Sequence, residues 1–290
     1  MFPPGTTAAT ELLMSQNPVP SWGSQYRLIA ADKWKAKSAA MGKAVTHAIV
    51  EYAQPAPGMR VLDLASGTGE PAITLATRVG PTGHVTALDL SSELLEVATQ
   101  RAQARGLKNF TTKQTDAHSL PFPDSSFDLA TSRFGIMFFH DPELALRELL
   151  RVLRPGARAS FLAWGPFDQP YWQTTMGVVH QHVGGPLLVP DGHDPFRFSK
   201  PGSLSAIFRN AGFQSVEEET RTVSWTWPGA PDELWEYAKS VSVPFRSMLD
   251  RVRPEDWPKL NADVHAAVQK YSDGKQISFG ATVVLASGKK

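Results

Sequence analysis

The chain of 290 residues is 42% hydrophobic and 20% charged, which excludes a disordered chain and supplies enough apolar residues for a sizeable core. Its 29 basic and 28 acidic residues leave a formal net charge of +1, so no strong field steers it onto nucleic acid or an anionic membrane. The absence of cysteine excludes disulfides, a catalytic thiol and thiolate metal sites.

Signals for membrane insertion and secretion are missing from the sequence. It has no run of about 18 apolar residues, the length that a membrane-spanning helix needs. The first residues, MFPPGTTAATELLMSQ, lack the basic region followed by an apolar block that marks a secretory signal. We therefore predict a cytoplasmic protein, monomeric or homodimeric, that binds neither membrane nor nucleic acid.

Short apolar runs alternate with helical periodicity between residues 59 and 164. Residues 59–64 (MRVLDL) and 84–89 (HVTALD) have the pattern of buried strands, each introduced by turn residues. Three further strands are predicted in this stretch, at 109–115, 127–133 and 157–163.

Two of the intervening helices carry clear start signals. Ser91 or Ser92 can cap the first, and Asp141 followed by Pro142 begins the second, which the Pro155-Gly156 turn ends. Strands that alternate with helices predict right-handed crossovers and a parallel sheet covered on both faces. The fold class is therefore α/β, with a doubly wound, Rossmann-like sheet.

The flanks of this core differ from it. Residues 22–53 are predicted to be helical, while 213–227 and 276–286 are predicted strands that complete the sheet with an antiparallel edge. Residues 165–200 are rich in proline, glycine and aromatic residues, and 228–275 carry aromatic residues on helical stretches.

The most informative stretch is VLDLASGTGE, residues 61–70. A glycine-rich turn between a strand and a helix lets backbone N–H groups approach a ligand closely. Asp89 ends the next strand, about 20 residues on, where a carboxylate accepts hydrogen bonds from the ribose hydroxyls of a nucleoside. The same turn also satisfies the loose dinucleotide pattern G-x-G-x-x-A, so it does not by itself distinguish a dinucleotide from another ligand that contains a nucleoside.

Three features favour a cofactor other than a dinucleotide. Asp63 would repel a pyrophosphate, but it suits a ligand that carries an amino group or a sulfonium. Asp116 follows the third strand, where it can accept from the exocyclic amine of adenine. The third feature is the helix, turn and strand in RELLRVLRPGARASFLAW.

The run from VLDLASGTGE through Asp89, TDAHSLPFPDSSFD and LLRVLRPGA resembles a class I S-adenosylmethionine-dependent methyltransferase. Within that class it is most similar to the ubiquinone/menaquinone-biosynthesis (methyltransferase type 11) group. The resemblance is strong over residues 59–164 and extends to FSKPGSLSAIFRNAGF and the C-terminal strand. It implies a seven-stranded sheet whose last strand is antiparallel, and S-adenosylmethionine as cofactor with S-adenosylhomocysteine as product.

The resemblance also assigns cofactor contacts. Those around the methionine part are implied to be Asp63, Ala65, Gly67 and Gly69, with Ser66 beside them. Those around the rest of the cofactor are implied to be Asp89 and Leu90 at the ribose, Asp116 and Ala117 at the adenine edge, and Arg133 and Phe134 below the sulfonium.

The domain organisation is predicted from this resemblance together with the composition of the flanks. Residues 1–55 are predicted to form an N-terminal helical cap, and 56–290 the methyltransferase domain, with its cofactor core at 59–164. The insertions 165–200 and 228–275 are predicted to form the acceptor pocket and its lid. Aromatic residues in the flanks suit an apolar acceptor, and the candidate acceptor contacts are Tyr26, Trp34, Trp164, Tyr171 and Trp172.

Histidines are the candidates for acid–base or metal chemistry. His140 lies just past the fourth strand, where ligands bind, so it is the best candidate for a general base; the alternative is that it packs at the start of the next helix. No three of the remaining histidine and carboxylate side chains are predicted to converge, so we expect no metal.

The function predicted from these features is methyl transfer to a small, largely apolar or aromatic molecule by in-line displacement. Two other functions remain open for this glycine-rich turn. One is an NAD-linked oxidoreductase, and the other is a non-catalytic regulatory protein that binds S-adenosylmethionine.

Overall fold

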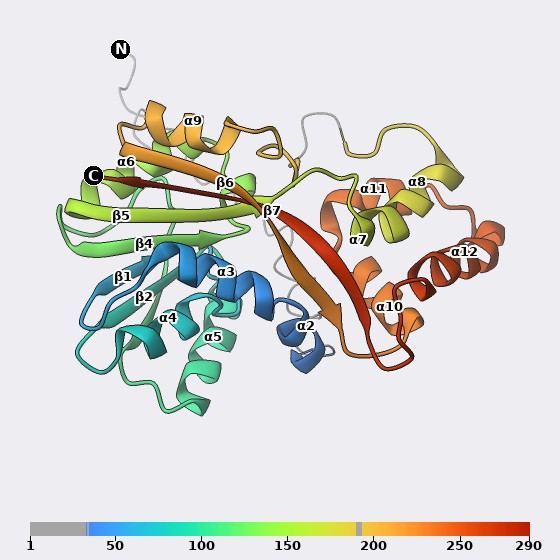
Figure 1. Ribbon diagram of the computed structural model, residues 1–290, viewed down its shortest axis with the longest axis horizontal. Helices are drawn as coiled ribbons and strands as arrows, with labels where there is room; N and C mark the ends of the chain where they lie inside the picture. The colour runs from blue at the N-terminus through green and yellow to red at the C-terminus, as the bar shows by residue number, and fades with distance from the viewer. Residues whose placement is uncertain (1–32, 34, 190–192) are drawn as a thin grey trace, which may run out of the picture.

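The computed structural model describes residues 33, 35–189 and 193–290 and contains one seven-stranded sheet with the order β3-β2-β1-β4-β5-β7-β6 (Figure 1). Strand β7 runs antiparallel to β5 and β6, and the other neighbouring strands pair in parallel. This arrangement confirms the predicted fold. The strands are β1 (Arg60–Asp63), β2 (His84–Asp89), β3 (Phe110–Gln114), β4 (Phe127–Arg133), β5 (Leu153–Trp164), β6 (Gln214–Trp227) and β7 (Ile277–Lys289).

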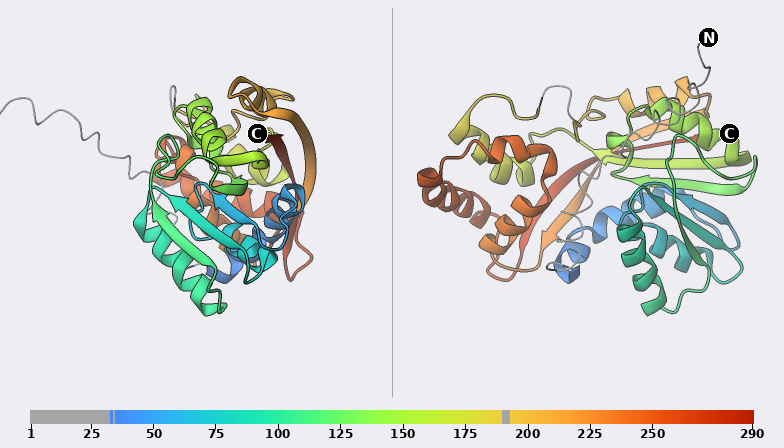
Figure 2. Two further views of the ribbon diagram at one scale, coloured as in Figure 1. Left: turned by 90° about the vertical axis from the view of Figure 1, so that its left-hand side faces the viewer. Right: turned by 180° about the vertical axis from the view of Figure 1, so that it is seen from behind.

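Helices cover both faces of the sheet, as the parallel crossovers require (Figures 1 and 2). One face carries α3 (Lys43–Ala53), α4 (Ala72–Val79) and α5 (Ser92–Ala104). The other carries α6 (Pro142–Val152) and α9 (Ser203–Asn210). The core lies between these layers, with buried side chains such as Leu62 and Phe161 on the central strands.

The predicted helix caps are present. The Ser91 hydroxyl accepts a hydrogen bond from the Leu94 N–H at 3.2 Å, and the Asp141 carboxylate accepts one from the Leu144 N–H at 2.9 Å. Each cap satisfies one of the N–H groups that a helix leaves without a partner in its first turn. The helices α5 and α6 therefore begin at the residues that the sequence predicts.

One boundary differs from the prediction. Strand β5 begins at Leu153, directly after α6, and runs through the Pro155-Gly156 segment that was expected to separate helix from strand. Tertiary contacts explain this, because the Ser126 N–H donates to the Val152 carbonyl and the Gly156 N–H donates to the carbonyl of Lys290. Both partners are distant in sequence, so local turn propensity did not indicate them.

The two C-terminal strands extend past the rest of the sheet, beside a group of helices in the segments predicted to form the lid, which we call the lid helices (Figure 1). β7 pairs with β5 only as far as Val283 with Trp164, whereas its pairing with β6 continues to Ile277 with Trp227. The lid helices are α7 (Pro170–Trp172), the π-helical turn η2 (Gln173–Gly177), α8 (Val178–Val183), α10 (Pro231–Val241), α11 (Arg246–Leu249) and α12 (Trp257–Gln269). These helices fall within the predicted insertions 165–200 and 228–275.

A short N-terminal helix, α2 (Lys35–Met41), precedes α3 and packs beside β6. The ammonium of Lys37 donates to the Glu233 carboxylate of α10 at 2.5 Å, which joins this helix to the lid. Tyr26 and Trp34, two of the predicted acceptor contacts, lie outside the described residues. Within the part of the chain that the structure describes, every helix is too short or too polar to cross a membrane.

Candidate active site

The candidate cofactor residues gather at one edge of the sheet. Asp63 ends β1, Asp89 ends β2, Asp116 follows β3 and Arg133 ends β4. These four strands are adjacent and parallel, so their carboxyl ends share one edge. In open α/β sheets ligands bind at this edge, beside the point where the strand order reverses.

The glycine-rich turn leaves the sheet directly after β1. Gly67 and Gly69 have φ angles of 53° and 108°, in the region that favours glycine. A Cβ atom on Gly69 would come within 2.5 Å of the Ile73 Cδ1 atom, so a larger residue would also push the following helix away. Ala65 adopts φ 53° as well, a left-handed conformation that is uncommon for residues with a Cβ.

Asp63 is fully buried beneath this turn. Its Oδ1 atom accepts a hydrogen bond from the Thr131 hydroxyl at 2.6 Å, and its Oδ2 atom has no hydrogen-bond partner in the structure. Burial in a site of low polarity raises the pKa of Asp63 to about 7, although the Thr131 and Ser66 side chains and Arg133 oppose the shift. A buried carboxylate oxygen without a partner fits a ligand that brings a cationic donor, such as the amino group of S-adenosylmethionine.

Asp89 links the end of β2 to the glycine-rich turn. Its Oδ2 atom accepts from the Gly67 N–H at 2.8 Å and its Oδ1 atom accepts from the Ser91 N–H at 3.0 Å. These two bonds fix the carboxylate and leave each oxygen with further capacity to accept a hydroxyl. The neighbouring Leu90 is 45% exposed and therefore accessible to a ligand at this edge of the sheet.

Asp116 is engaged by a histidine that the sequence reasoning did not select. The carboxylate contacts the His118 Nδ1 atom at 2.5 Å and accepts from the His118 N–H at 2.9 Å. Although burial opposes it, these bonds hold the pKa of Asp116 below its usual value. His118 Nε2 accepts from the Asp141 N–H, so Nδ1 carries the proton that faces Asp116. In the sequence, the only indication of this contact is that Asp116 and His118 are two positions apart in TDAH.

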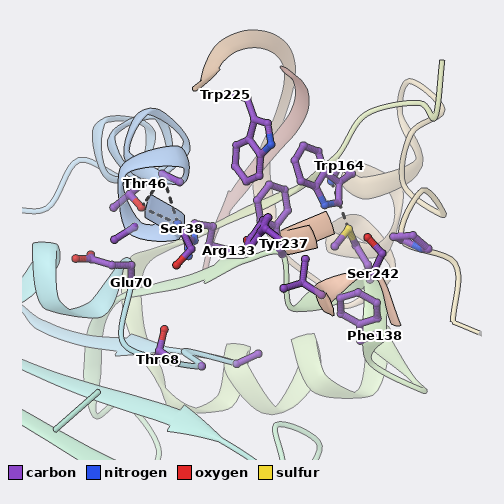
Figure 3. Close-up of a pocket in the computed structure, with 18 of the residues that line it drawn as sticks. Ser38, Thr46, Thr68, Glu70, Arg133, Phe138, Trp164, Trp225, Tyr237 and Ser242 are labelled. Carbon is purple, nitrogen blue, oxygen red and sulfur yellow. Dashed lines mark hydrogen bonds between the residues drawn. The ribbon is translucent and has the colours of Figure 1, made fainter. Parts of the chain in front are cut away.

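A cavity of about 300 Å³ opens beside the turn, between the sheet edge, the N-terminal helices and the lid (Figure 3). Ala65, Ser66 and Gly67 line its turn side, and the N-terminal segment contributes Ser38 and Ala39 of α2, Thr46 of α3 and Gly42 between these helices. Of the predicted cofactor residues, Arg133 and Phe134 also line it. The remaining cofactor candidates lie outside the lining: Asp63, Gly69, Asp89, Leu90, Asp116 and Ala117.

Arg133 and Phe134 line the cavity and also contact α3 and β5. The Arg133 guanidinium donates to the Thr46 hydroxyl at 2.7 Å and to the Gly42 carbonyl at 3.4 Å, which holds α3 against the end of β4. Phe134 has a left-handed backbone, with φ 59°, and its ring stacks on Trp164 with centroids 4.3 Å apart. A strained aromatic residue at a ligand-binding edge is a common mark of a functional site.

Aromatic side chains form the lid side of the cavity. The predicted acceptor contacts Trp164, Tyr171 and Trp172 all line it, and each is at least nine-tenths buried. Trp164 meets both Trp172 and Trp225 edge to face, with centroids 5.4 Å and 5.1 Å away. These contacts lock the indoles in place and make a rigid aromatic wall.

The comparisons with known proteins agree with this geometry. A family model described as a methyltransferase domain matches residues 55–162. The ubiquinone/menaquinone biosynthesis C-methyltransferase UbiE of Ectopseudomonas mendocina is 34% identical over 185 residues, which cover 60% of this chain and 72% of the relative. The demethylmenaquinone methyltransferase of Thermus thermophilus is 37% identical over 175 residues, which cover 56% of this chain and 77% of the relative. The chain belongs to the class I S-adenosylmethionine-dependent methyltransferases of the ubiquinone/menaquinone-biosynthesis type.

A solved structure shares the fold of this methyltransferase. The YcgJ protein from Bacillus subtilis superposes with a TM-score of 0.53 at 22% identity, over 84% of this chain and 97% of that protein. S-adenosylmethionine is the cofactor, and the NAD-linked and non-catalytic alternatives are not favoured by the relatives.

Sequence reasoning missed several residues that line the methyltransferase cavity. Trp225 lies on β6, and Tyr237 and Phe245 lie on α10 and the short turn after it. Their aromatic character was visible in the sequence, but the side that each faces depends on how the lid folds back. Arg101 of α5 also lines the cavity, and it donates to the hydroxyl and carbonyl oxygens of Thr68 in the glycine-rich turn.

The histidine candidates lie away from the methyltransferase cavity. His140 is exposed, stacks on His118 with centroids 3.7 Å apart, and is not part of the cavity lining. Its catalytic role stays a prediction, and its position supports the alternative of packing at the start of α6. His182 pairs with Asp263 on the lid surface at 2.9 Å. Within residues 33, 35–189 and 193–290, no three histidine or carboxylate side chains are placed to share a metal ion.

Proposed function

We propose that this methyltransferase acts on a small, largely apolar or aromatic acceptor, which binds against the aromatic wall beside the glycine-rich turn. One observation carries the proposal: aromatic side chains from β5, α7, β6 and the α10 segment converge on the cavity that Gly67 lines. Aromatic surfaces contribute large apolar contact with fixed geometry, and they also stabilise a nearby sulfonium charge. The convergence therefore suits both partners of a methyl transfer.

The cofactor residues are proposed to act along the sheet edge in the order of the strands. Bound S-adenosylmethionine supplies an electrophilic methyl group on sulfur. Asp63 receives the amino group, because its Oδ2 atom is buried without a partner. Asp89 holds the ribose, and Asp116 with Ala117 reads the adenine edge. The contacts of Asp116 with His118 fix its carboxylate for this role.

The acceptor is proposed to be a ring of the quinol type. Two relatives are named for ubiquinone/menaquinone biosynthesis and for demethylmenaquinone methylation. A flat ring suits a wall in which Phe134 and Trp164 stack within 16° of parallel. The protein's part in the reaction is to align the nucleophile with the methyl group and to exclude water, which is worth about 7–11 kcal/mol for well-oriented reactants.

The N-terminal cap (1–55) and the insertions 165–200 and 228–275 are proposed to act as a lid on the core at 59–164. The ion pair of Lys37 in α2 with Glu233 in α10 joins the cap to the lid. Such a lid would open for exchange of the ligands and close over them to exclude water during the reaction. The near-zero net charge supports an enzyme without a nucleic-acid partner, and we propose that it is cytoplasmic and monomeric or homodimeric.

The test is product formation with reduced naphthoquinone. The full chain is incubated with S-adenosylmethionine and 1,4-naphthoquinol, and the products are analysed by mass spectrometry. We expect S-adenosylhomocysteine together with a naphthoquinol that has gained one methyl group. Binding of S-adenosylhomocysteine without methylation of this or related hydroxyarenes would contradict the proposed acceptor class, and absence of binding would contradict the cofactor assignments.

A further inference from the structure

Three polar atoms in the aromatic wall have no partner. They are the indole Nε1 atoms of Trp172 and Trp225 and the hydroxyl oxygen of Ser242. The three residues are 7%, 8% and 4% exposed, and all three line the cavity. In Figure 3, Trp225 and Ser242 lie on either side of Trp164.

Buried polar atoms without partners are rare, because each has given up its hydrogen bonds to water. Since all three residues line one cavity, a molecule bound there is our candidate for supplying these partners. The edge-to-face contacts with Trp164 keep both indoles in fixed orientations, so their N–H groups are positioned before the molecule arrives.

The chemistry of this wall selects what can bind. An indole N–H only donates, and a serine hydroxyl can donate. On the lid side of the cavity, the described lining side chains include no aspartate, glutamate, histidine or lysine. Burial raises the pKa of Tyr171 well above its usual value, so that phenol stays protonated at neutral pH and can donate as well. The wall thus offers donors and lacks an anionic acceptor.

The cavity also has a cationic side. The Arg133 guanidinium lines the cavity next to Phe134, at the end of β4. Among the described lining residues the carboxylate is that of Glu70, on the turn side, so the donors of the wall and the Arg133 guanidinium complement an oxygen anion bound against the lid side. An amine, which presents N–H groups or a positive charge, would leave the donors of the wall unpaired.

We propose that Trp172 Nε1, Trp225 Nε1 and Ser242 Oγ determine the acceptor specificity of this enzyme by donating hydrogen bonds to the oxygens of a hydroxyarene or enol bound as its oxyanion. This inference rests on the proposed function, since it assigns the same cavity to the acceptor. It accounts for a wall without a general base, because an acceptor that ionises in solvent needs none on the protein.

The test uses two probes with the same ring and different polar groups. 1-Naphthol and 1-naphthylamine are titrated by calorimetry into the full chain saturated with S-adenosylhomocysteine. We expect 1-naphthol to bind at least about tenfold more tightly, and its affinity to rise with pH up to its own ionisation. Equal affinities for the two probes, no binding of 1-naphthol, or a 1-naphthol affinity that is independent of pH would overturn the proposal.

Substitutions separate the hydrogen bonds from packing. Replacing Trp225 or Trp172 with β-(3-benzothienyl)alanine exchanges the N–H for sulfur and keeps the bicyclic shape. Each replacement, and Ser242→Ala, should weaken 1-naphthol binding about 3- to 10-fold and leave 1-naphthylamine within twofold. The matched control is the same analogue at Trp235. Its indole N–H donates to the Asn261 side-chain oxygen at 2.8 Å, and Trp235 is not part of the cavity lining. Equal losses for both probes would show a packing effect and refute the proposal.

The cofactor site and the acceptor contacts are tested separately. Titration of S-adenosylhomocysteine alone tests the cofactor site, in which none of these three polar atoms is assigned a hydrogen bond. Unchanged S-adenosylhomocysteine binding with no discrimination between the naphthyl probes would refute the acceptor inference only. Loss of S-adenosylhomocysteine binding by the unmodified chain would refute the proposed function itself.

Discussion

Replacement of Asp63 with asparagine should make the ligand-free protein more stable above neutral pH. In the unfolded chain this carboxyl ionises near its ordinary pKa of 3.8, whereas burial raises its pKa in the folded state to about 7. Between these two pKa values the folded state binds a proton that the unfolded chain has released. The free energy of unfolding therefore falls as the pH rises through this range. A shift of about 3 units corresponds to about 4 kcal/mol at pH 8.

The asparagine variant avoids this cost and introduces a smaller one. The amide oxygen can still accept from the Thr131 hydroxyl, but the amide nitrogen is left buried without an acceptor, at about 1–3 kcal/mol. The net gain expected for Asp63→Asn is about 1–3 kcal/mol at pH 8. It should shrink by about 2–3 kcal/mol at pH 5, where the wild-type carboxyl is protonated in the folded state.

Urea unfolding of both proteins at pH 5, 6, 7 and 8 measures this difference. Thr131→Val is the matched variant, because it removes the hydrogen bond that lowers the pKa of Asp63. The pH range over which Asp63 changes the free energy of unfolding should then extend to higher pH. A stability difference between wild type and Asp63→Asn that does not change with pH would refute the reasoning.

The same carboxylate should couple cofactor binding to pH. If Asp63 receives the amino group of the cofactor, its proton must leave on binding. The wild-type affinity for S-adenosylhomocysteine should therefore rise toward tenfold per pH unit below pH 7 and level off above it. Asp63→Asn should weaken binding by about 1.5–3 kcal/mol at pH 8, at the same time as it stabilises the free protein.

Asp89→Ala should weaken S-adenosylhomocysteine binding in calorimetry by about 1.5–3 kcal/mol, because it removes charge-assisted hydrogen bonds; an unchanged affinity would exclude it from the site. His140→Ala should keep kcat/KM within about threefold, and a loss of about 100-fold or more would instead support a general base. Lys37→Ala or Glu233→Ala should speed hydrogen exchange in residues 35–41, and identical exchange would show that the ion pair does not hold the cap. Activity should survive treatment with a chelator, whereas a loss restored by magnesium or zinc would contradict metal-free catalysis.

Features that depend on short stretches of chain were readable from the sequence. The strands at 59–64 and 84–89, the caps at Ser91 and Asp141, and the glycine-rich turn all follow from residue order over fewer than about ten positions. The acids at the strand ends were also predictable, because parallel strands bring their carboxyl ends to one edge. The residues proposed to bind the cofactor could therefore be identified from short stretches of sequence.

The acceptor half was decided by the tertiary structure. Trp164 and Trp225 are 61 positions apart and become neighbours because β7 pairs between the strands that carry them. Aromatic residues are as common in a packed core as in a pocket, so composition does not distinguish the two. Which indole faces the cavity, and which N–H is left without a partner, depends on strand register and on how the lid folds over the sheet, and long-range packing sets both.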